Sequence, residues 1–227
     1  MGENSNPEIT SWINDAQALI TEIQQRSHGL VNVLLPPRLS TSTLVALHKD
    51  PQELALNIRR PMPRGQDQYS RRGTAFHLWV ERQFTDADTL FGDEYLDYLD
   101  PLDDDSKLED LKRAWLSSEF AHRTPTRVEV PFETTIAGVL IRGRIDAVYA
   151  TPTGFEVVDW KTGSTILDAS AAVQLAMYRL AWAKLSGTDI STVSAAFHYV
   201  PTSVTHRPAD LLDEEALIAL IQSIDTQ

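Results

Sequence analysis

The 227-residue chain contains no cysteine. This absence excludes disulfide bonds, cysteine-based zinc sites and iron–sulfur clusters. Long apolar runs are also missing, since no window approaches the roughly 18 uninterrupted apolar residues of a transmembrane helix. Residues 1–10 contain neither the basic nor the apolar segment of a secretory signal. Together these absences favour a cytoplasmic protein with no membrane partner.

Positive charge is scarce, because 20 lysines and arginines face 32 aspartates and glutamates, a net charge of -12 at pH 7. Such a balance argues against unaided binding of long nucleic acids, whose backbone normally needs a basic surface. The charge is unevenly distributed, however. Residues 86–110 hold eleven acidic side chains against one lysine, whereas residues 59–72 hold five arginines. If the chain acts on DNA, we expect a larger partner to supply basic surface.

The most informative stretch is residues 139–161, which we expect to form two strands joined by a tight turn. Val139–Tyr149 is rich in β-branched and aromatic residues, and residues 151–154 have the Thr-Pro-Thr-Gly composition of a turn. Phe155–Trp160 is a short apolar run typical of a strand buried on both faces.

Three charged side chains interrupt this apolar hairpin. Asp159 and Lys161 are two residues apart and share one face of their strand, and antiparallel pairing brings Asp146 close to Asp159. Buried charges are costly unless they are paired or bind a metal. A hard divalent ion takes carboxylate oxygens and leaves room for water and phosphate, which would indicate phosphodiester hydrolysis. The alternative is a surface hairpin in which Asp and Lys form a salt bridge.

Around the hairpin, helical spacing and turn residues predict further elements. The composition, 42% hydrophobic and 23% charged, is typical of a globular protein of one large or two small domains. The predicted elements are helices over residues 12–23, 39–48, 50–60, 71–81, 106–120, 168–185 and 210–224, strands over residues 126–134 and 194–200, and an acidic loop over residues 86–105. The core order is therefore helix, three strands, helix, strand.

Four short motifs follow one another along this order. They are G-x-x-x-H at Gly73 and His77, G-x-x-D at Gly143 and Asp146, D-x-K at Asp159 and Lys161, and Q-x-x-x-Y at Gln174 and Tyr178. With these motifs, residues 39–200 resemble the PD-(D/E)xK nucleases, specifically the RecB-type branch. The resemblance implies an α/β restriction-endonuclease-like core, a mixed central sheet flanked by helices, with extra helices at the N-terminus.

The same resemblance implies roles for individual residues. His77, Asp146 and Asp159 would bind Mg2+ or Mn2+, with the carbonyl of Trp160 completing the ligand set, and Asp146, Asp159 and Lys161 would be catalytic. The residues expected to bind substrate or support the site are Gln174, Tyr178, Arg72, Arg144 and Glu129. Glu129 is equally well explained as a strand-edge glutamate, and Glu81 is expected to be structural. Several RecB-type relatives carry a four-cysteine iron–sulfur cluster, so this chain resembles the cluster-free branch.

The flanking segments LSTSTLVAL, DPQELA, RRPMP and RRGTAFHLWVE are similar to the C-terminal nuclease module of actinobacterial UvrD-like helicase–nucleases, the AdnA/AdnB group. This similarity implies a UvrD-like helicase in the same or a partner chain, and cleavage of single-stranded DNA during double-strand-break processing. The sequence contains no G-x-x-x-x-G-K-[ST] loop, so the ATPase would lie elsewhere and the chain would be an excised module. We expect a helical extension over residues 1–38 and the nuclease domain over residues 39–227.

Two further interpretations remain at this stage. The fold could have become a catalytically silent module for DNA binding or assembly with a helicase, but the intact set of His77, Asp146, Asp159 and Lys161 argues against this. A standalone repair nuclease is disfavoured by the acidic charge, because its unassisted binding to DNA should be weak and salt-sensitive.

Overall fold

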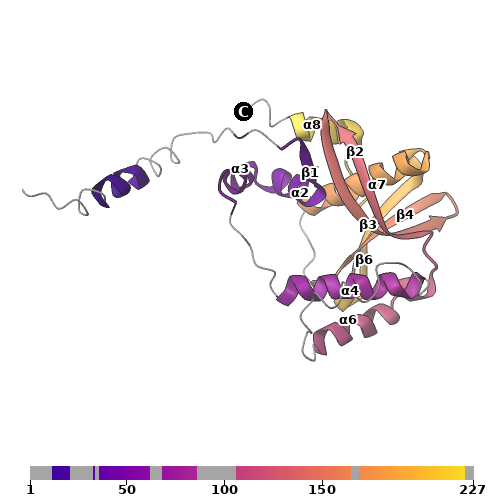
Figure 1. The fold of residues 1–227 in the computed structure, drawn as a ribbon. Coiled ribbons are helices and arrows are strands. Elements are labelled where there is room, and N and C mark those ends of the chain that lie inside the picture. The colour runs from indigo at the N-terminus through magenta and orange to yellow at the C-terminus, as the bar shows by residue number, and fades with distance from the viewer. Residues whose placement is uncertain are drawn as a thin grey trace, which may run out of the picture.

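The computed structural model describes residues 12–20, 33, 36–61, 68–85, 106–164 and 169–222. Its centre is a mixed sheet in which the described strands have the order β1-β3-β4-β5-β6, with β2 along the other edge of β3 (Figure 1). The strands are β1 Arg38–Ser40, β2 Arg127–Ile136, β3 Val139–Thr151, β4 Gly154–Lys161, β5 Val193–Tyr199 and β6 Val204–His206. The predicted hairpin is confirmed as β3 and β4, which pair antiparallel.

Parallel and antiparallel pairs both occur in this sheet, as the fold class requires. The three consecutive strands β2, β3 and β4 are antiparallel neighbours. β4 and β5 are parallel, and the chain crosses between them through α7, Ala172–Ser186. β2 pairs only with β3 among the described strands, so Pro131 lies on an edge strand, as its missing N–H group predicts. The predicted order of helix, three strands, helix and strand is confirmed.

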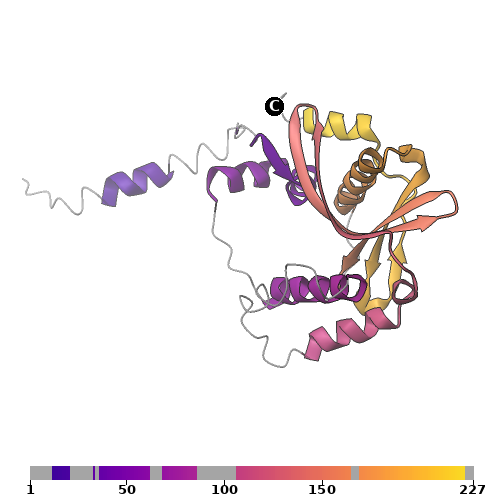
Figure 2. The ribbon, with the colours of Figure 1, turned by 45° about the vertical axis from the view of Figure 1, so that its right-hand side comes forward.

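Helices cover both faces of the sheet and bury two separate apolar clusters. On one face, α7 packs with α2, Thr41–Lys49, and with α8, Glu214–Gln222. On the other face, α4, Gln68–Phe84, and α6, Ser106–Leu116, pack together (Figures 1 and 2). α7 is buried on most of its surface, which explains why its sequence lacks a polar face.

Several helix ends follow directly from local sequence. Ser40 accepts a hydrogen bond from the Thr43 N–H at the start of α2. Asp50 accepts one from the Glu53 N–H, with a proline next in sequence, at the start of α3, Pro51–Arg59. Gly187 ends α7 in the left-handed conformation with φ of 67°, which glycine adopts without steric cost. These ends are set by contacts within a few residues, so the sequence alone predicts them.

Other predicted boundaries were wrong. The helix predicted for residues 106–120 ends at Leu116, and a short 3-10 helix, Glu119–His122, follows, with the Ser118 hydroxyl accepting from the Phe120 N–H. The last helix begins at Glu214 instead of residue 210, because Asp213 caps it by accepting from the Ala216 N–H. The helix predicted from residue 168 begins at Ala172, after a 3-10 turn.

Some predictions lie partly or wholly outside the described residues. Residues 12–20 are helical and exposed, but the rest of the predicted first helix, most of the loop after residue 60 and the acidic segment 86–105 are not described. In the described part of the chain, no helix has both the length and the apolar character needed to cross a membrane.

Candidate active site

The candidate site forms where β3 and β4 separate. Their pairing ends at Ala147 and Val158, and the preceding part of β3 pairs with β1 instead. At this point the backbone N–H of Trp160 donates to Asp146 Oδ2 over 2.8 Å. A side-chain carboxylate therefore satisfies a main-chain donor that the diverging strands leave without a partner, and this bond holds Asp146 beside the end of β4.

Helix α4 adds a histidine to this carboxylate. His77 Nδ1 lies 3.5 Å from Glu129 Oε1 and 3.6 Å from Asp146 Oδ2. Glu129 has a left-handed φ of 48° and lies between two pairs of the β2–β3 ladder, Val128 with Ala147 and Val130 with Ile145. One ligand atom from each of His77, Glu129 and Asp146 lies within 4.8 Å of the others.

Burial and crowding of carboxylates perturb both titratable partners. Burial raises the pKa of Asp146 to about 7, with the imidazole of His77 opposing and the carboxylates of Asp159 and Glu129 adding to the increase. Burial by itself would lower the pKa of His77, but Asp146, Glu129 and Asp159 outweigh it and bring that pKa to about 9. The cluster thus has an excess of negative charge that favours binding a proton or another cation.

The D-x-K pair belongs to a second network, which is completed by α7. Lys161 Nζ lies 2.8 Å from Asp159 Oδ2 and donates to Gln174 Oε1 over 2.9 Å. Gln174 Nε2 donates to Asp159 Oδ1 over 2.7 Å and to the hydroxyl of Tyr178 over 2.8 Å. The predictions that Asp159 and Lys161 share a face, and that Gln174 and Tyr178 do, are confirmed. One amide therefore positions both members of the D-x-K pair.

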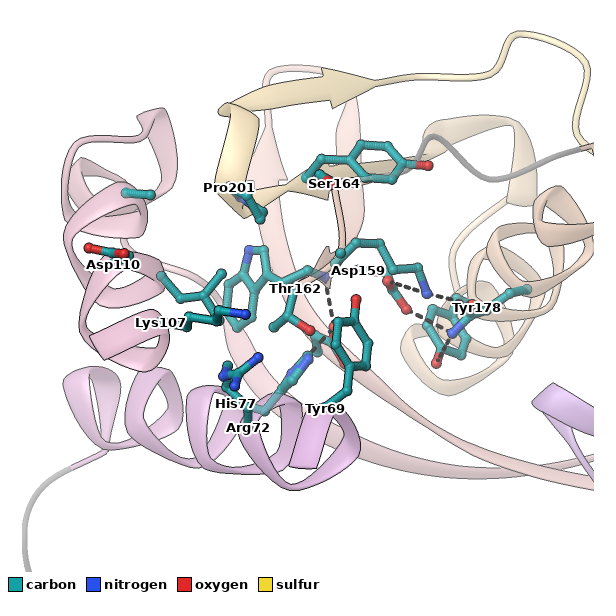
Figure 3. Close-up of a pocket in the computed structure, with 18 residues that line it drawn as sticks. Tyr69, Arg72, His77, Lys107, Asp110, Asp159, Thr162, Ser164, Tyr178 and Pro201 are labelled. Atoms are coloured by element: carbon teal, nitrogen blue, oxygen red, sulfur yellow. Dashed lines mark hydrogen bonds and ion pairs between the residues drawn. The ribbon is translucent and has the colours of Figure 1, made fainter. Parts of the chain in front are cut away.

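Both networks open into a single cavity of about 970 Å³ (Figure 3). Most residues predicted for the site line it: Arg72, His77, Asp146, Asp159, Trp160, Lys161, Gln174 and Tyr178. Glu129 contacts His77 but does not line the cavity. Arg144, whose side chain is exposed, pairs with Glu129 Oε2 at 3.4 Å and does not line the cavity either. The structure thus brings together groups from α4, β3, β4 and α7.

Sequence reasoning missed two features of this site. It named Glu129 only as a supporting residue, whereas the structure groups Glu129 with His77 and Asp146. Asp159, which the resemblance gives as a ligand, contacts Lys161 and Gln174, and its role as a ligand stays a prediction. It also assigned no role to α6, although Lys107 and Asp110 line the cavity. The strand register that places Glu129 level with Asp146, and the packing of α6 against α4, are not visible in local sequence.

The donor set fits a hard divalent cation. Glu129 Oε1 and Asp159 Oδ2 are buried and accept no hydrogen bond from any described residue, although Asp159 Oδ2 has the ammonium of Lys161 close by. Carboxylate oxygens with one imidazole suit Mg2+ or Mn2+ better than a soft metal, and the chain offers no thiolate. The excess negative charge of the cluster and the buried Glu129 Oε1 are both features that a bound cation would offset.

The glycines of the first two motifs, Gly73 and Gly143, differ in how strongly the surrounding structure requires glycine. A Cβ atom on Gly143 would clash with Thr41 Oγ1 and lie 2.7 Å from the ring of Phe132, so the close packing of β3 requires glycine there. Gly73 is less constrained, since a Cβ atom there would lie 3.4 Å from Thr162 Oγ1, an ordinary contact.

We therefore predict that Gly143→Ala lowers the free energy of unfolding by about 1–3 kcal/mol through overpacking. Gly73→Ala, in the interior of α4, is expected to leave stability unchanged or raise it by up to about 1 kcal/mol, because alanine favours helix. Urea denaturation of the two variants beside the unmodified chain measures both effects. Equal stability of the two alanine variants would contradict the packing argument for Gly143.

The sequence profile of the PD-(D/E)XK nuclease superfamily matches residues 38–224, so the chain belongs to this superfamily. The mixed sheet flanked by helices is consistent with the superfamily's fold. Membership supports nuclease activity in general terms, and the cavity with His77, Asp146, Asp159 and Lys161 lies within the matched residues.

Two solved structures are similar to the chain at low sequence identity. The crystal structure of SSO0001 is 16% identical, with a TM-score of 0.42, over 92% of this chain and 87% of that chain. The crystal structure of a protein named as a candidate exonuclease from Eubacterium rectale is 10% identical, with a TM-score of 0.48, over 84% and 78% of the two chains. The comparison with curated proteins gave no significant match. The assignment to the superfamily therefore rests on the profile match.

Proposed function

We propose that the chain is a metal-dependent deoxyribonuclease of the RecB-like branch, which hydrolyses phosphodiester bonds in single-stranded DNA. The observation that carries this proposal is the meeting of two groups at one cavity. The first is the cluster of His77, Glu129 and Asp146, and the second is the pair Asp159 and Lys161. A salt-bridged surface hairpin would not bury carboxylates beside a histidine, since such burial is costly without a bound cation.

His77, Asp146 and Glu129 would hold the ion, Mg2+ or Mn2+, and the resemblance to RecB-type nucleases adds Asp159 and the carbonyl of Trp160 as further ligands. When bound, the ion supplies positive charge at the scissile phosphate and lowers the pKa of a coordinated water. The protein itself holds Asp146 through the Trp160 N–H, so this carboxylate is preorganised before the ion arrives.

Lys161 supplies a localised positive charge beside this cluster. Asp159 and Gln174 hold its Nζ at 2.8 and 2.9 Å, so the ammonium group is already oriented before substrate enters. A preorganised cation stabilises negative charge that develops on the phosphate, at no cost of reorganisation during the reaction. Gln174 and Tyr178 then act by positioning Lys161 and Asp159 through their hydrogen bonds.

The biological setting we propose is the nuclease module of a DNA helicase–nuclease of the UvrD-like, AdnA/AdnB type, acting in double-strand-break processing and recombinational repair. The net charge of -12 supports a partner that delivers DNA, because the chain has little basic surface of its own. Arg72 at the cavity and Arg144 beside Glu129 provide local positive charge. The alternative is a catalytically silent module for DNA binding or helicase assembly.

The test is cleavage of end-labelled single-stranded DNA by the purified chain with Mg2+ or Mn2+, and with a chelator. Metal-dependent cutting is the expected result. If calorimetry shows metal binding but the chain does not cut DNA, the same cleavage assay is repeated with a UvrD-like helicase added. If the chain neither binds the metal nor cuts DNA under these conditions, the nuclease proposal is rejected in favour of the silent module.

A further inference from the structure

An aromatic side chain outside the four motifs stands at the mouth of the cavity. Tyr69 lies in the first turn of α4 and lines the cavity, yet 54% of the residue is exposed. It is four residues before Gly73 and eight before His77, so the three share one face of the helix, with Tyr69 about 12 Å along the axis from His77. The helix face that holds the candidate metal ligand thus continues outward to an exposed ring (Figure 3).

The tyrosine spans from α4 to the loop that follows β4. A Cβ atom on Gly163 would clash with the Tyr69 hydroxyl, so this ring reaches the segment two residues after Lys161. The hydroxyl makes no hydrogen bond within the described part of the chain, and the ring is not buried in either apolar cluster. Within the described residues, packing and hydrogen bonding therefore do not explain why an aromatic residue is at this position.

Cationic side chains surround the same opening. Arg72 contributes from α4 and Lys107 from α6, while Lys161 lies deeper, beside Asp159. The acidic Asp110 also lines the cavity, but its carboxylate is 3.0 Å from Arg113. Proteins bind single-stranded nucleic acid by combining cationic side chains along the phosphate backbone with aromatic rings on which bases stack.

We propose that Tyr69 stacks on a base of single-stranded DNA within a few nucleotides of the scissile phosphate, and so selects single strands over duplex. This inference rests on the proposed nuclease function and specifies its substrate. In a duplex both faces of an interior base are covered by neighbouring bases, so the ring has no free face to stack on. In a single strand the base can turn onto the ring while Arg72 and Lys107 contact the backbone.

The test measures binding separately from cleavage. The 227-residue chain carrying Lys161→Ala is titrated against fluorescein-labelled oligothymidylate, and anisotropy reports the dissociation constant in the presence of Mn2+. Adding Tyr69→Ala is expected to weaken binding roughly 5- to 100-fold, the range of one lost stacking contact. Tyr69→Phe should restore the affinity, because stacking needs the ring and not the hydroxyl. Trp12→Ala, at an exposed aromatic that does not line the cavity, is the matched control.

A series of oligonucleotides with one abasic site at successive positions identifies the stacked base. An abasic site at one of these positions should weaken DNA binding by the chain that keeps Tyr69. The same abasic site should not weaken DNA binding by the Tyr69→Ala chain any further. The inference would be overturned if the Tyr69 and Tyr69→Ala chains bound the oligonucleotide equally well. It would also be overturned if the loss of affinity from Tyr69→Ala added to that from the abasic site at every position, or if Tyr69→Ala weakened binding to blunt duplex equally. Cleavage is measured separately, with the chain that keeps Lys161. If this chain cuts DNA but the loss at the abasic position does not depend on Tyr69, only the stacking role is rejected. If that loss depends on Tyr69 but the chain does not cut DNA, only the nuclease function is rejected.

Discussion

Lys161→Ala is expected to reduce metal-dependent cleavage of DNA by roughly 100- to 1000-fold, the usual cost of removing one preorganised charge-stabilising group. The side chain is anchored between Asp159 and Gln174 and faces the cavity, so its loss removes positive charge at the reacting phosphate. The cluster of His77, Glu129 and Asp146 is left in place. Affinity for Mn2+ should therefore change much less than the cleavage rate, which single-turnover kinetics and calorimetry on the same preparation would show.

Lys184→Ala is the matched control for this substitution. Lys184 is on α7, pairs with Glu214 at 2.6 Å and does not line the cavity, so cleavage should be unchanged. Lys161→Arg tests geometry, because a forked guanidinium cannot replace a compact ammonium held by two partners. We expect Lys161→Arg to retain only a small part of the activity. Cleavage at the unmodified rate by Lys161→Ala would show that Lys161 is not a catalytic residue.

Asp146→Asn is expected to abolish cleavage and weaken Mn2+ binding by more than about 100-fold, which the cleavage assay and calorimetry with Mn2+ measure. Asparagine has nearly the same shape and its carbonyl oxygen can still accept from the Trp160 N–H. Burial raises the pKa of Asp146 to about 7, but its ionised carboxylate also helps to raise the pKa of the buried His77 to about 9. Removing the carboxylate therefore removes one unfavourable buried charge and one favourable ion pair from the metal-free fold.

Two companion substitutions distinguish the possible ligand sets. If the ion binds at the group that the structure brings together, Glu129→Gln should weaken Mn2+ binding more than Asp159→Asn does. The family resemblance predicts the opposite order, with Asp159 as a ligand. Unchanged Mn2+ affinity in Asp146→Asn would contradict both sets, because Asp146 belongs to each.

Much of the local structure was predictable because short-range chemistry determines it. The turn between β3 and β4, the caps at Ser40 and Asp50 and the glycine after α7 each depend on neighbours a few residues away. The three-residue strands β1 and β6 were missed, since segments so short have no periodicity. They are strands only because β3 and β5 offer them partners.

In the candidate site, too, local sequence predicts some features and only the tertiary structure shows the others. Side-chain alternation along β4 was enough to place Asp159 and Lys161 on one face, and helical spacing was enough for Gln174 and Tyr178. The roles of these residues remain predictions. No local pattern could show that Glu129 would approach His77, because that depends on the register of β2 against β3 and on where α4 packs.

By itself the sequence determined the superfamily, the order of its core elements and most of the residues that meet at the cavity, because the motifs stand on regular strands and helices. Only the tertiary structure decided which carboxylate joins His77, that α6 forms a wall of the cavity and that Tyr69 stands at its mouth. These depend on contacts between segments far apart in the chain, where packing of whole elements, not the preference of any residue, sets the distances.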